Sequence, residues 1–185
     1  MAWARAEPDA FVIGIDATAA AMAETSRRAE RPGQRGGVSN ALFVVAAAER
    51  PPAELLGIAD ELTINFPWGS LLRGALALDD AAACGIAALL KPGTRLDALV
   101  SVTPRDGLGL APMDEPGAAD QLAGRWAHHG LRLDAVCLAT EADVAATRST
   151  WARRLAVGRA RPAWRLTLSR QEQPEVADDD LDRAG

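Results

Sequence analysis

The chain has 185 residues, a length that bounds it to about one domain of 100–200 residues with room for a hydrophobic core. Hydrophobic residues make up 49% and charged residues 24%, which is a globular balance and excludes a disordered chain. The formal net charge of −5 argues at first sight against binding to nucleic acid, because phosphate binding depends on clustered Lys and Arg. Cys84 and Cys137 have no paired spacing, so we expect packing residues and no metal. No window approaches the roughly 18 apolar residues of a membrane span, so we expect a cytoplasmic protein.

Strand-like apolar runs alternate with helix-like stretches along the chain. The expected strands cover 11–16, 41–47, 62–68, 95–103, 131–139 and 163–169. The expected helices cover 19–31, 70–90, 117–128 and 141–157. Apolar runs of this kind fit strands buried on both faces. The alternation therefore predicts an α/β fold with a doubly wound, mostly parallel sheet.

Charge is unevenly distributed. The stretch 148–170 has seven arginines and no acid, whereas Glu172–Asp182 carries six acids and no base. A second basic run stands where a helix is expected to give way to a loop; it comprises Arg27, Arg28, Arg31 and Arg35. On charge alone, both basic runs are interpreted as solvated helix faces. We expect one domain over 1–170 and a flexible acidic tail over 171–185.

Residues that follow the strands are the first functional candidates, because ligands of parallel α/β sheets bind outside the carboxyl ends of strands. Asp16 ends the first expected strand and could accept hydrogen bonds from a nucleotide ribose, or cap the following helix. Ala48 and Glu49 follow the second strand. Glu49 could contact a ligand or lie solvated in a loop.

An aromatic loop, Phe66–Pro67–Trp68–Gly69–Ser70, follows the third expected strand. It offers a stiff platform for stacking a planar base, with Ser70 placed to cap the next helix. The alternative is a tryptophan that closes the core. Trp151 favours the platform because it lies inside the arginine-rich stretch, and aromatic rings beside arginines hold single-stranded or flipped bases.

Four stretches resemble the 16S rRNA adenine-N1 methyltransferases that confer kanamycin–apramycin resistance by modifying adenine 1408 of the decoding site. They are FVIGID (11–16), GGVSNALFVVAAAE (36–49), ADELTINFPWGSLLRG (59–74) and STWARRLAVGRARPAWRL (149–166). In this order and spacing they are highly specific, and the resemblance spans Ala4 to about Ser169. It implies a Rossmann-like class I fold and S-adenosylmethionine as cofactor. It also implies a monomer that acts on 16S rRNA in the 30S subunit and methylates N1 of a flipped adenine.

The resemblance further implies roles for individual residues. Asp16 matches the family's acid that holds the cofactor ribose, and Ala48 and Glu49 match the segment beside the cofactor adenine. Ser70 matches a position in the site that usually carries a hydroxyl group. Phe66, Pro67 and Trp68 match the loop that borders the methyl group and the target base. Trp68 and Trp151 match the two aromatic rings between which the flipped base stacks. Residues near the target base and the rRNA backbone in the family correspond to Ser149, Arg154, Arg159 and Arg161. A basic loop that docks on rRNA corresponds to Arg27, Arg28, Arg31 and Arg35.

One part of the family pattern is absent, which makes the expected fold N-terminally truncated. Class I methyltransferases begin with a central strand and a glycine-rich turn that wraps the methionine end of the cofactor, and no such G-x-G sequence precedes Asp16. Either the start is placed too late, which we favour, or the chain is a truncated product. Because the missing strand lies in mid-sheet, we expect exposed edges, poor stability and weak cofactor binding.

Two rival functions stay open. A non-catalytic rRNA-binding protein, or an inactive truncated homologue, would use the 148–170 stretch without cofactor, and the absent glycine turn supports it. Another nucleotide-binding α/β enzyme would share the same alternation, although nothing in the sequence resembles a P-loop.

Overall fold

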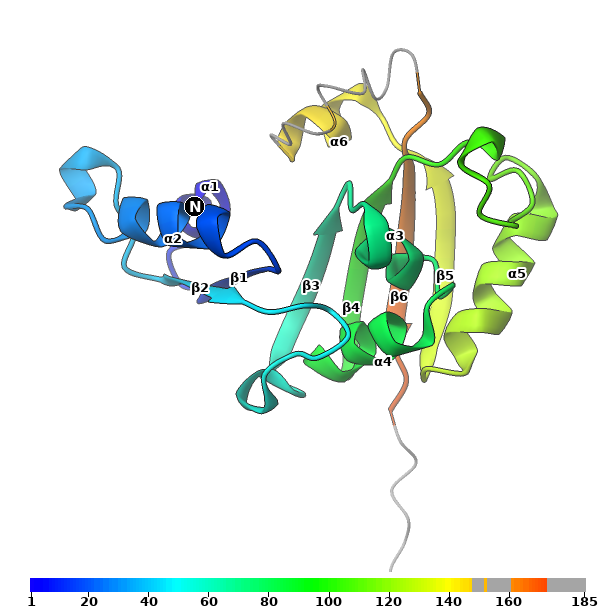
Figure 1. Ribbon diagram of the computed structural model, residues 1–185, viewed down its shortest axis with the longest axis horizontal. Helices are drawn as coiled ribbons and strands as arrows, with labels where there is room; N and C mark the ends of the chain where they lie inside the picture. The colour runs from blue at the N-terminus through cyan, green and yellow to red at the C-terminus, as the bar shows by residue number, and fades with distance from the viewer. Residues whose placement is uncertain (148–151, 153–160, 173–185) are drawn as a thin grey trace, which may run out of the picture.

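The computed structural model describes residues 1–147, 152 and 161–172 (Figure 1). Its helices are α1 (Ala2–Ala6), α2 (Ala19–Ala29), α3 (Gly69–Ala75), α4 (Asp80–Leu89), α5 (Pro116–Ala127) and α6 (Glu141–Ala146). Its strands are β1 (Val12–Asp16), β2 (Ala41–Val45), β3 (Ala59–Asn65), β4 (Leu90–Val100), β5 (Leu131–Leu138) and β6 (Trp164–Arg170). The 3-10 helices are η1 (Gly33–Arg35), η2 (Ala53–Leu55) and η3 (Pro104–Asp106). Every expected strand is present, with shifted ends.

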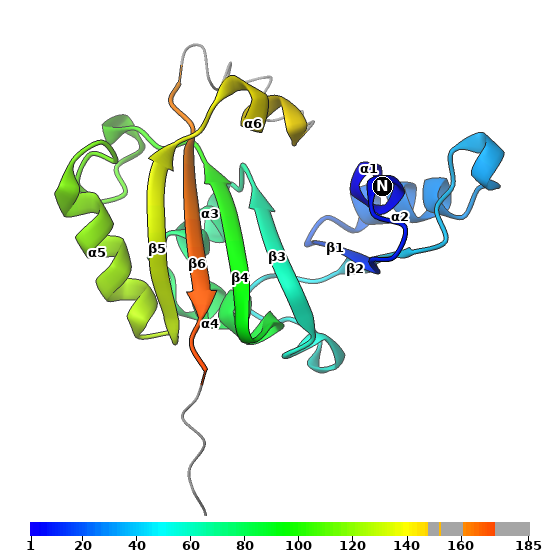
Figure 2. The same ribbon diagram turned by 180° about the vertical axis from the view of Figure 1, so that it is seen from behind.

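The described strands form two sheets. β1 and β2 pair in parallel, and the second sheet has the order β3-β4-β6-β5. β3 is parallel to β4, whereas β6 is antiparallel to both β4 and β5, so β3, β4 and β5 share one direction. Both views show the two sheets side by side, and no described strand joins them (Figures 1 and 2). Among the described strands, β3 is therefore paired on one edge only, by β4.

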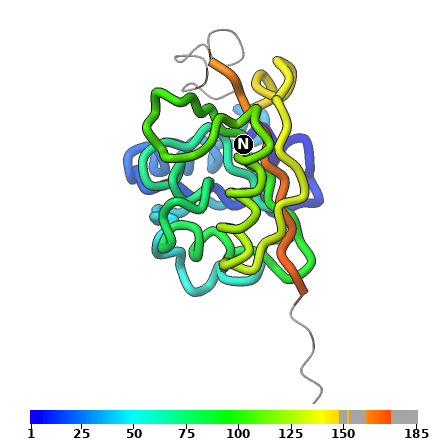
Figure 3. Tube along the Cα trace, turned by 90° about the vertical axis from the view of Figure 1, so that its right-hand side faces the viewer, coloured from blue at the N-terminus to red at the C-terminus, as the bar shows by residue number. Residues whose placement is uncertain are grey.

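The main core lies on one face of the four-stranded sheet. Helices α3, α4 and α5 cover this face (Figure 1), and the side view shows α5 beside β5 (Figure 3). Successive strand residues point to opposite faces, so alternate residues of the central strands enter the core. The fully buried ones are Leu96, Ala98 and Val100 of β4 and Leu166 and Leu168 of β6.

The opposite face of this sheet is polar. It is turned toward the viewer in Figure 2, where α3 and α4 lie behind it. Arg95 Nε lies 2.8 Å from Asp97 Oδ2, and Thr167 Oγ1 donates to Asp97 Oδ1 at 2.9 Å. Because burying charged groups costs desolvation energy, a face of this composition is stable in contact with water.

The expected helix over 70–90 is two helices, α3 and α4. Asp79 caps α4, because its carboxylate accepts a hydrogen bond from Ala82 N at 3.1 Å. Between the helices Ala77 has φ +49°, a left-handed conformation that ends a helix. A Cβ at Gly74 would lie 2.6 Å from Ala82 Cβ, so glycine lets the two helices approach. Within the residues that the structure describes, none of the helices has the length and apolar character needed to span a bilayer.

Residues 2–45 form what we call the N-terminal lobe, in which hydrogen bonds of Asn40 connect segments that lie far apart in the sequence. Asn40 Nδ2 donates to the carbonyls of Ala4, Glu7 and Ala10 at 2.9, 3.0 and 2.8 Å. These bonds tie the segment before β1 to the start of β2. Neither hydrophobic core cluster of the described residues includes a member of this lobe.

Candidate functional site

The aromatic loop after β3 turns away from the sheet at a strained residue. Phe66 has φ +49°, which costs a non-glycine residue on the order of 1–3 kcal/mol. Its amide still donates to Leu99 O at 2.7 Å, so the turn begins one residue beyond the β3–β4 ladder. The Phe66 side chain packs in a small core cluster with Leu99, Ala152 and Ala163. The strained turn directs Trp68 outward, where 69% of its surface is exposed.

A pocket of about 470 Å³ opens at this loop, beyond the carboxyl ends of β3 and β4. Its wall combines apolar, cationic and anionic groups. The lining includes Phe66, Pro67, Trp68, Gly69, Leu72, Arg73, Ser101, Asp106, Leu108 and Arg161. The pocket therefore brings together four of the residues predicted from the sequence: Phe66, Pro67, Trp68 and Arg161.

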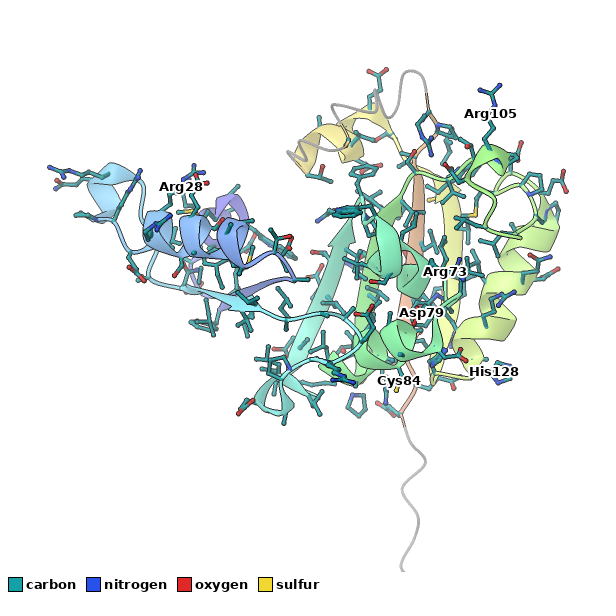
Figure 4. All side chains as sticks on the ribbon, viewed as in Figure 1. Arg28, Arg73, Asp79, Cys84, Arg105 and His128 are labelled. Atoms are coloured by element: carbon teal, nitrogen blue, oxygen red, sulfur yellow. The ribbon has the colours of Figure 1, made fainter. Side chains whose placement is uncertain are left out.

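Sequence reasoning missed Arg73, Ser101 and Asp106 as pocket residues. Asp106 belongs to a capping box with Thr103 at the start of η3, so the Thr-x-x-Asp spacing was the available signal. Ser101 follows β4 directly and Asp106 ends η3 in the loop after it, at the strand end where ligands of such sheets bind. Arg73 lies on α3 (Figure 4), and its Nη2 donates to Leu78 O at 3.2 Å.

Three of the four predicted cofactor residues lie at or just after the carboxyl ends of β1 and β2, namely Asp16, Ala48 and Glu49. Asp16 pairs with Val45 in the ladder, and its carbonyl accepts from Ala46 N at 3.2 Å. Asp16 Oδ1 accepts from Thr18 N at 2.7 Å. Thr18 is the N-cap of α2. Asp16 therefore stabilises the turn before the helix rather than capping it, and its carboxylate stays exposed.

The loop after β2 rests on α4. A Cβ at Gly85 would lie 1.8 Å from Ala48 O, so the carbonyl of Ala48 approaches the helix backbone as only glycine permits. Glu49 follows this contact and is half-buried. Ser70 lies in the first turn of α3, but the N-cap is Trp68, so the expected cap at Ser70 is wrong.

The predicted rRNA-binding residues fall in different regions. Those of the first basic run lie at the end of α2 and in the loop and η1 after it, all exposed: Arg27, Arg28, Arg31 and Arg35. Figure 4 shows Arg28 on the N-terminal lobe, far from Arg73 and Arg105 in the view. Four further predicted residues lie outside the described residues, namely Ser149, Trp151, Arg154 and Arg159. Cys84 and Cys137, expected to pack inside, are exposed.

The parallel strands, the acid that ends β1 and the pocket after β3 define a class I, Rossmann-like methyltransferase fold. Solved structures support this class. A tryptophan variant of the 16S rRNA (adenine(1408)-N(1))-methyltransferase from Catenulisporales acidiphilia, with cosubstrate SAM, is 30% identical with a TM-score of 0.82 and covers 94% of this chain and 81% of that one. The 16S rRNA methyltransferase KamB is 31% identical with a TM-score of 0.79 and covers 92% and 81%.

Residues 1–170 match the family model NpmA, described as 16S rRNA (adenine(1408)-N(1))-methyltransferase. A relative of that description from Escherichia coli is 30% identical over 170 residues, which cover 87% of this chain and 77% of the relative. Another from Streptoalloteichus tenebrarius is 35% identical over 165 residues, covering 85% and 75%. This chain therefore belongs to the family of 16S rRNA (adenine(1408)-N(1))-methyltransferases.

Proposed function

We propose that this chain transfers a methyl group from S-adenosylmethionine to N1 of adenine 1408 in 16S rRNA, and so confers aminoglycoside resistance. The observation that carries the proposal is Trp68, an exposed indole at a 470 Å³ pocket beyond β3 and β4, in a chain of this family. A ring that is 69% exposed contributes little to the core. An exposed indole can stack on a base.

The residues at the ends of β1 and β2 fit the nucleoside part of S-adenosylmethionine. An exposed carboxylate after a parallel strand accepts hydrogen bonds from ribose hydroxyls, and Asp16 is in that position. Ala48 and Glu49 would line the adenine, and Ser70 would supply a hydroxyl. When bound, S-adenosylmethionine supplies a methyl group on a sulfonium, which is already activated for transfer.

The aromatic loop would hold the target base. Unstacking a base costs a few kcal/mol, and stacking it on an aromatic ring returns about 1–3 kcal/mol. Trp68 and Trp151 would stack the two faces of the adenine, so together they could offset extrusion. Phe66 and Pro67 are buried, and Phe66 has a strained backbone with φ +49°, which favours a fixed orientation for Trp68. A fixed orientation places N1 in line with the methyl group and raises the effective concentration.

The reaction requires no strong base from the protein. Adenine N1 carries an in-plane lone pair and is mostly unprotonated at neutral pH, so it can attack the methyl group directly. Methylation leaves a positive charge on the adenine. That charge would repel the ammonium groups of a bound aminoglycoside, which is the route to resistance that we propose.

The rRNA would contact two basic surfaces. One is the first basic run, Arg27, Arg28, Arg31 and Arg35, which has no acidic partner within 4 Å among the described residues. The other comprises Ser149, Arg154, Arg159 and Arg161. Replacing the four arginines of the first run by alanine should lower the slope of log affinity against log salt by about 0.7–0.9 per lost phosphate contact. We further propose that the partner is the 30S subunit and that the enzyme is a cytoplasmic monomer without a metal.

Primer extension across adenine 1408, on 30S subunits incubated with S-adenosylmethionine and the chain, tests the proposal. A stop at this base is the expected result for the wild type. Trp68→Ala should lower the methylation rate about 10- to 100-fold, because about 1–3 kcal/mol of stacking is lost. The matched control is Trp3→Ala in α1, also partly exposed, which should leave the rate unchanged. No stop with the wild type would contradict the proposed activity, and equal rates for the wild type and Trp68→Ala would contradict the stacking role of Trp68.

One observation favours a second candidate function, an rRNA-binding protein without catalysis. No described strand joins the two sheets beside Asp16, and the exposed arginines Arg27, Arg28, Arg31 and Arg35 could contact rRNA without a cofactor. Calorimetric titration with S-adenosylmethionine separates the two functions. No detectable cofactor binding together with tight 30S binding would favour the second, whereas saturable cofactor binding would favour the enzyme.

A further inference from the structure

The Arg161 side chain is held by two residues that follow β4. Its Nε donates to Ser101 Oγ at 3.3 Å, and its Nη2 donates to Ser101 O at 3.3 Å and to Asp106 Oδ2 at 2.7 Å. Ser101 Oγ in turn donates to Pro162 O at 2.8 Å. A guanidinium has donors on three nitrogens, and within the described ranges Nη1 has no partner. The Nη1 donors are therefore available to a ligand.

The Asp106 side chain is also held by hydrogen bonds that do not involve Arg161. Its Oδ2 accepts from Thr103 N at 2.7 Å and from Thr103 Oγ1 at 3.0 Å, which closes the capping box of η3. Burial alone would raise the pKa of Asp106, but the hydrogen bonds from Thr103 and Arg161 outweigh it and lower that pKa. The carboxylate is therefore ionised at neutral pH. It can hold the guanidinium by a charge-assisted bond.

The three residues stand at the pocket that Trp68 borders. Arg161 and Asp106 are both partly covered, with 27% and 29% of their side chains exposed. A base seated against Trp68 carries its own phosphodiester, which must lie near the rim of the pocket. An arginine whose Nε and Nη2 are occupied presents the Nη1 side to such an anion with little rotational freedom left to lose.

A second Thr-x-x-Asp box in the same chain gives an internal comparison. Thr140 and Asp143 cap α6, and Asp143 Oδ1 lies 2.8 Å from Arg165 Nη2. This pair repeats the chemistry of the Asp106–Arg161 pair, but neither of its members lines the pocket. It serves as a control for the purely structural value of such a pair.

We propose that Ser101 and Asp106 are positioning residues that hold Arg161 at the Trp68 pocket, so that its Nη1 donors bind a phosphate group of the RNA beside the stacked base. The inference rests on the proposed function. It assigns no contact between Asp106 and the RNA, because a carboxylate would repel a phosphate. Asp106 acts through Arg161, so its effect must disappear when the arginine is removed.

A double-mutant cycle on 30S subunits tests this dependence. The variants are Asp106→Asn, Arg161→Ala, their combination and Ser101→Ala, with Asp143→Asn as the matched control and circular dichroism to verify folding. For each variant, the 30S affinity at several salt concentrations, kcat, KM and the affinity for S-adenosylmethionine are measured.

We expect Asp106→Asn and Arg161→Ala each to weaken 30S binding and raise KM about tenfold, as the loss of one charge-assisted contact predicts. Each should reduce the salt slope by about 0.7–0.9, the value for one phosphate. The double variant should be no weaker than Arg161→Ala, Ser101→Ala should show the same change to a smaller degree, and cofactor affinity should not change.

Three results would overturn the inference: an added loss from Asp106→Asn in the Arg161→Ala background, an unchanged salt slope, or an equal effect of Asp143→Asn. A wild type that methylates adenine 1408 together with any of these would reject the positioning role alone. A wild type that neither binds nor methylates 30S subunits would reject the proposed function with it.

Discussion

The N-terminal lobe and the four-stranded region are built from the same α/β alternation but are held together differently. The four-stranded region contains both core clusters, in which Leu96, Leu122 and Trp126 are fully buried. In the lobe, the buried hydrophobic residues are Ala4 and Ala29, while Phe11 and Leu42 are 64% and 46% exposed. The same local pattern therefore yields a packed core in one region and a hydrogen-bonded, apolar surface in the other.

The difference arises from how many neighbouring strands each strand pairs with in its sheet. A two-stranded sheet buries too little surface to be stable alone, whereas three or more strands with one apolar face packed against helices can form a stable core. β4 is paired on both edges, by β3 and β6, whereas β1 is paired only with β2 among the described strands. The lobe should therefore open at lower free energy than the four-stranded region.

The largest expected effect contrasts one leucine from each region. Leu166→Ala in β6 should lower the free energy of unfolding by about 2–5 kcal/mol, because it leaves a cavity in a closed core. Leu42→Ala in β2 should lower it by less than about 1 kcal/mol, since the side chain is half exposed. Urea titration measures both losses, and equal losses would remove the distinction between the regions.

A smaller effect concerns the loop that connects the two regions. Gly85→Ala should lower the free energy of unfolding by about 1–3 kcal/mol, because its Cβ would force the Ala48 carbonyl away from α4. The variant should also weaken S-adenosylmethionine binding, since Glu49 moves with Ala48. The control is Gly124→Ala in α5, where a Cβ meets nothing within 4 Å. That variant should be stabilised by up to about 1 kcal/mol, and destabilisation of both would show that helical glycine itself is required.

The smallest expected effect is a pH dependence in the four-stranded region. Hydrogen bonds from the backbone and side chain of Thr140, together with Arg165, lower the pKa of Asp143 below its ordinary 3.8. Its stabilisation is therefore complete above pH 3.8 and is lost as the pH falls from there through the folded-state pKa. Asp143→Asn should melt earlier than the wild type at pH 7 and approach it at acidic pH. Thermal melts across this pH range measure the difference in melting temperature between the two proteins, with Glu141→Gln in the same helix as control. A difference that does not change with pH would contradict the predicted role of the Asp143 carboxylate.

Much of the fold could be predicted because strand periodicity is a local property. The runs at 11–16 and 131–139 became β1 and β5 nearly as expected. The helix expected over 70–90 was wrong in one respect, because its break depends on the packing of Gly74 against Ala82. That contact joins two helix faces and is not a property of either stretch alone.

The candidate site also contains residues that local motifs predict and residues that only long-range contacts reveal. Phe66, Pro67, Trp68 and Arg161 could be proposed from motifs, and the structure brings them to one pocket. For Asp106 the Thr-x-x-Asp box predicted a helix cap and no RNA contact, and Ser101 had no signal, because a serine after a strand is common. Their meaning depends on Arg161, which lies 60 and 55 residues further along the chain.

By itself, the sequence determined the strand runs, the family motifs and the segregation of charge, because these depend on residue type and spacing. Only the tertiary structure decided which strands pair and which faces close. It also turned Trp68 outward at the strained Phe66 and joined Ser101, Asp106 and Arg161 at one pocket. The physical reason is that pairing, burial and charge-assisted hydrogen bonds depend on distances between residues that lie far apart in the chain.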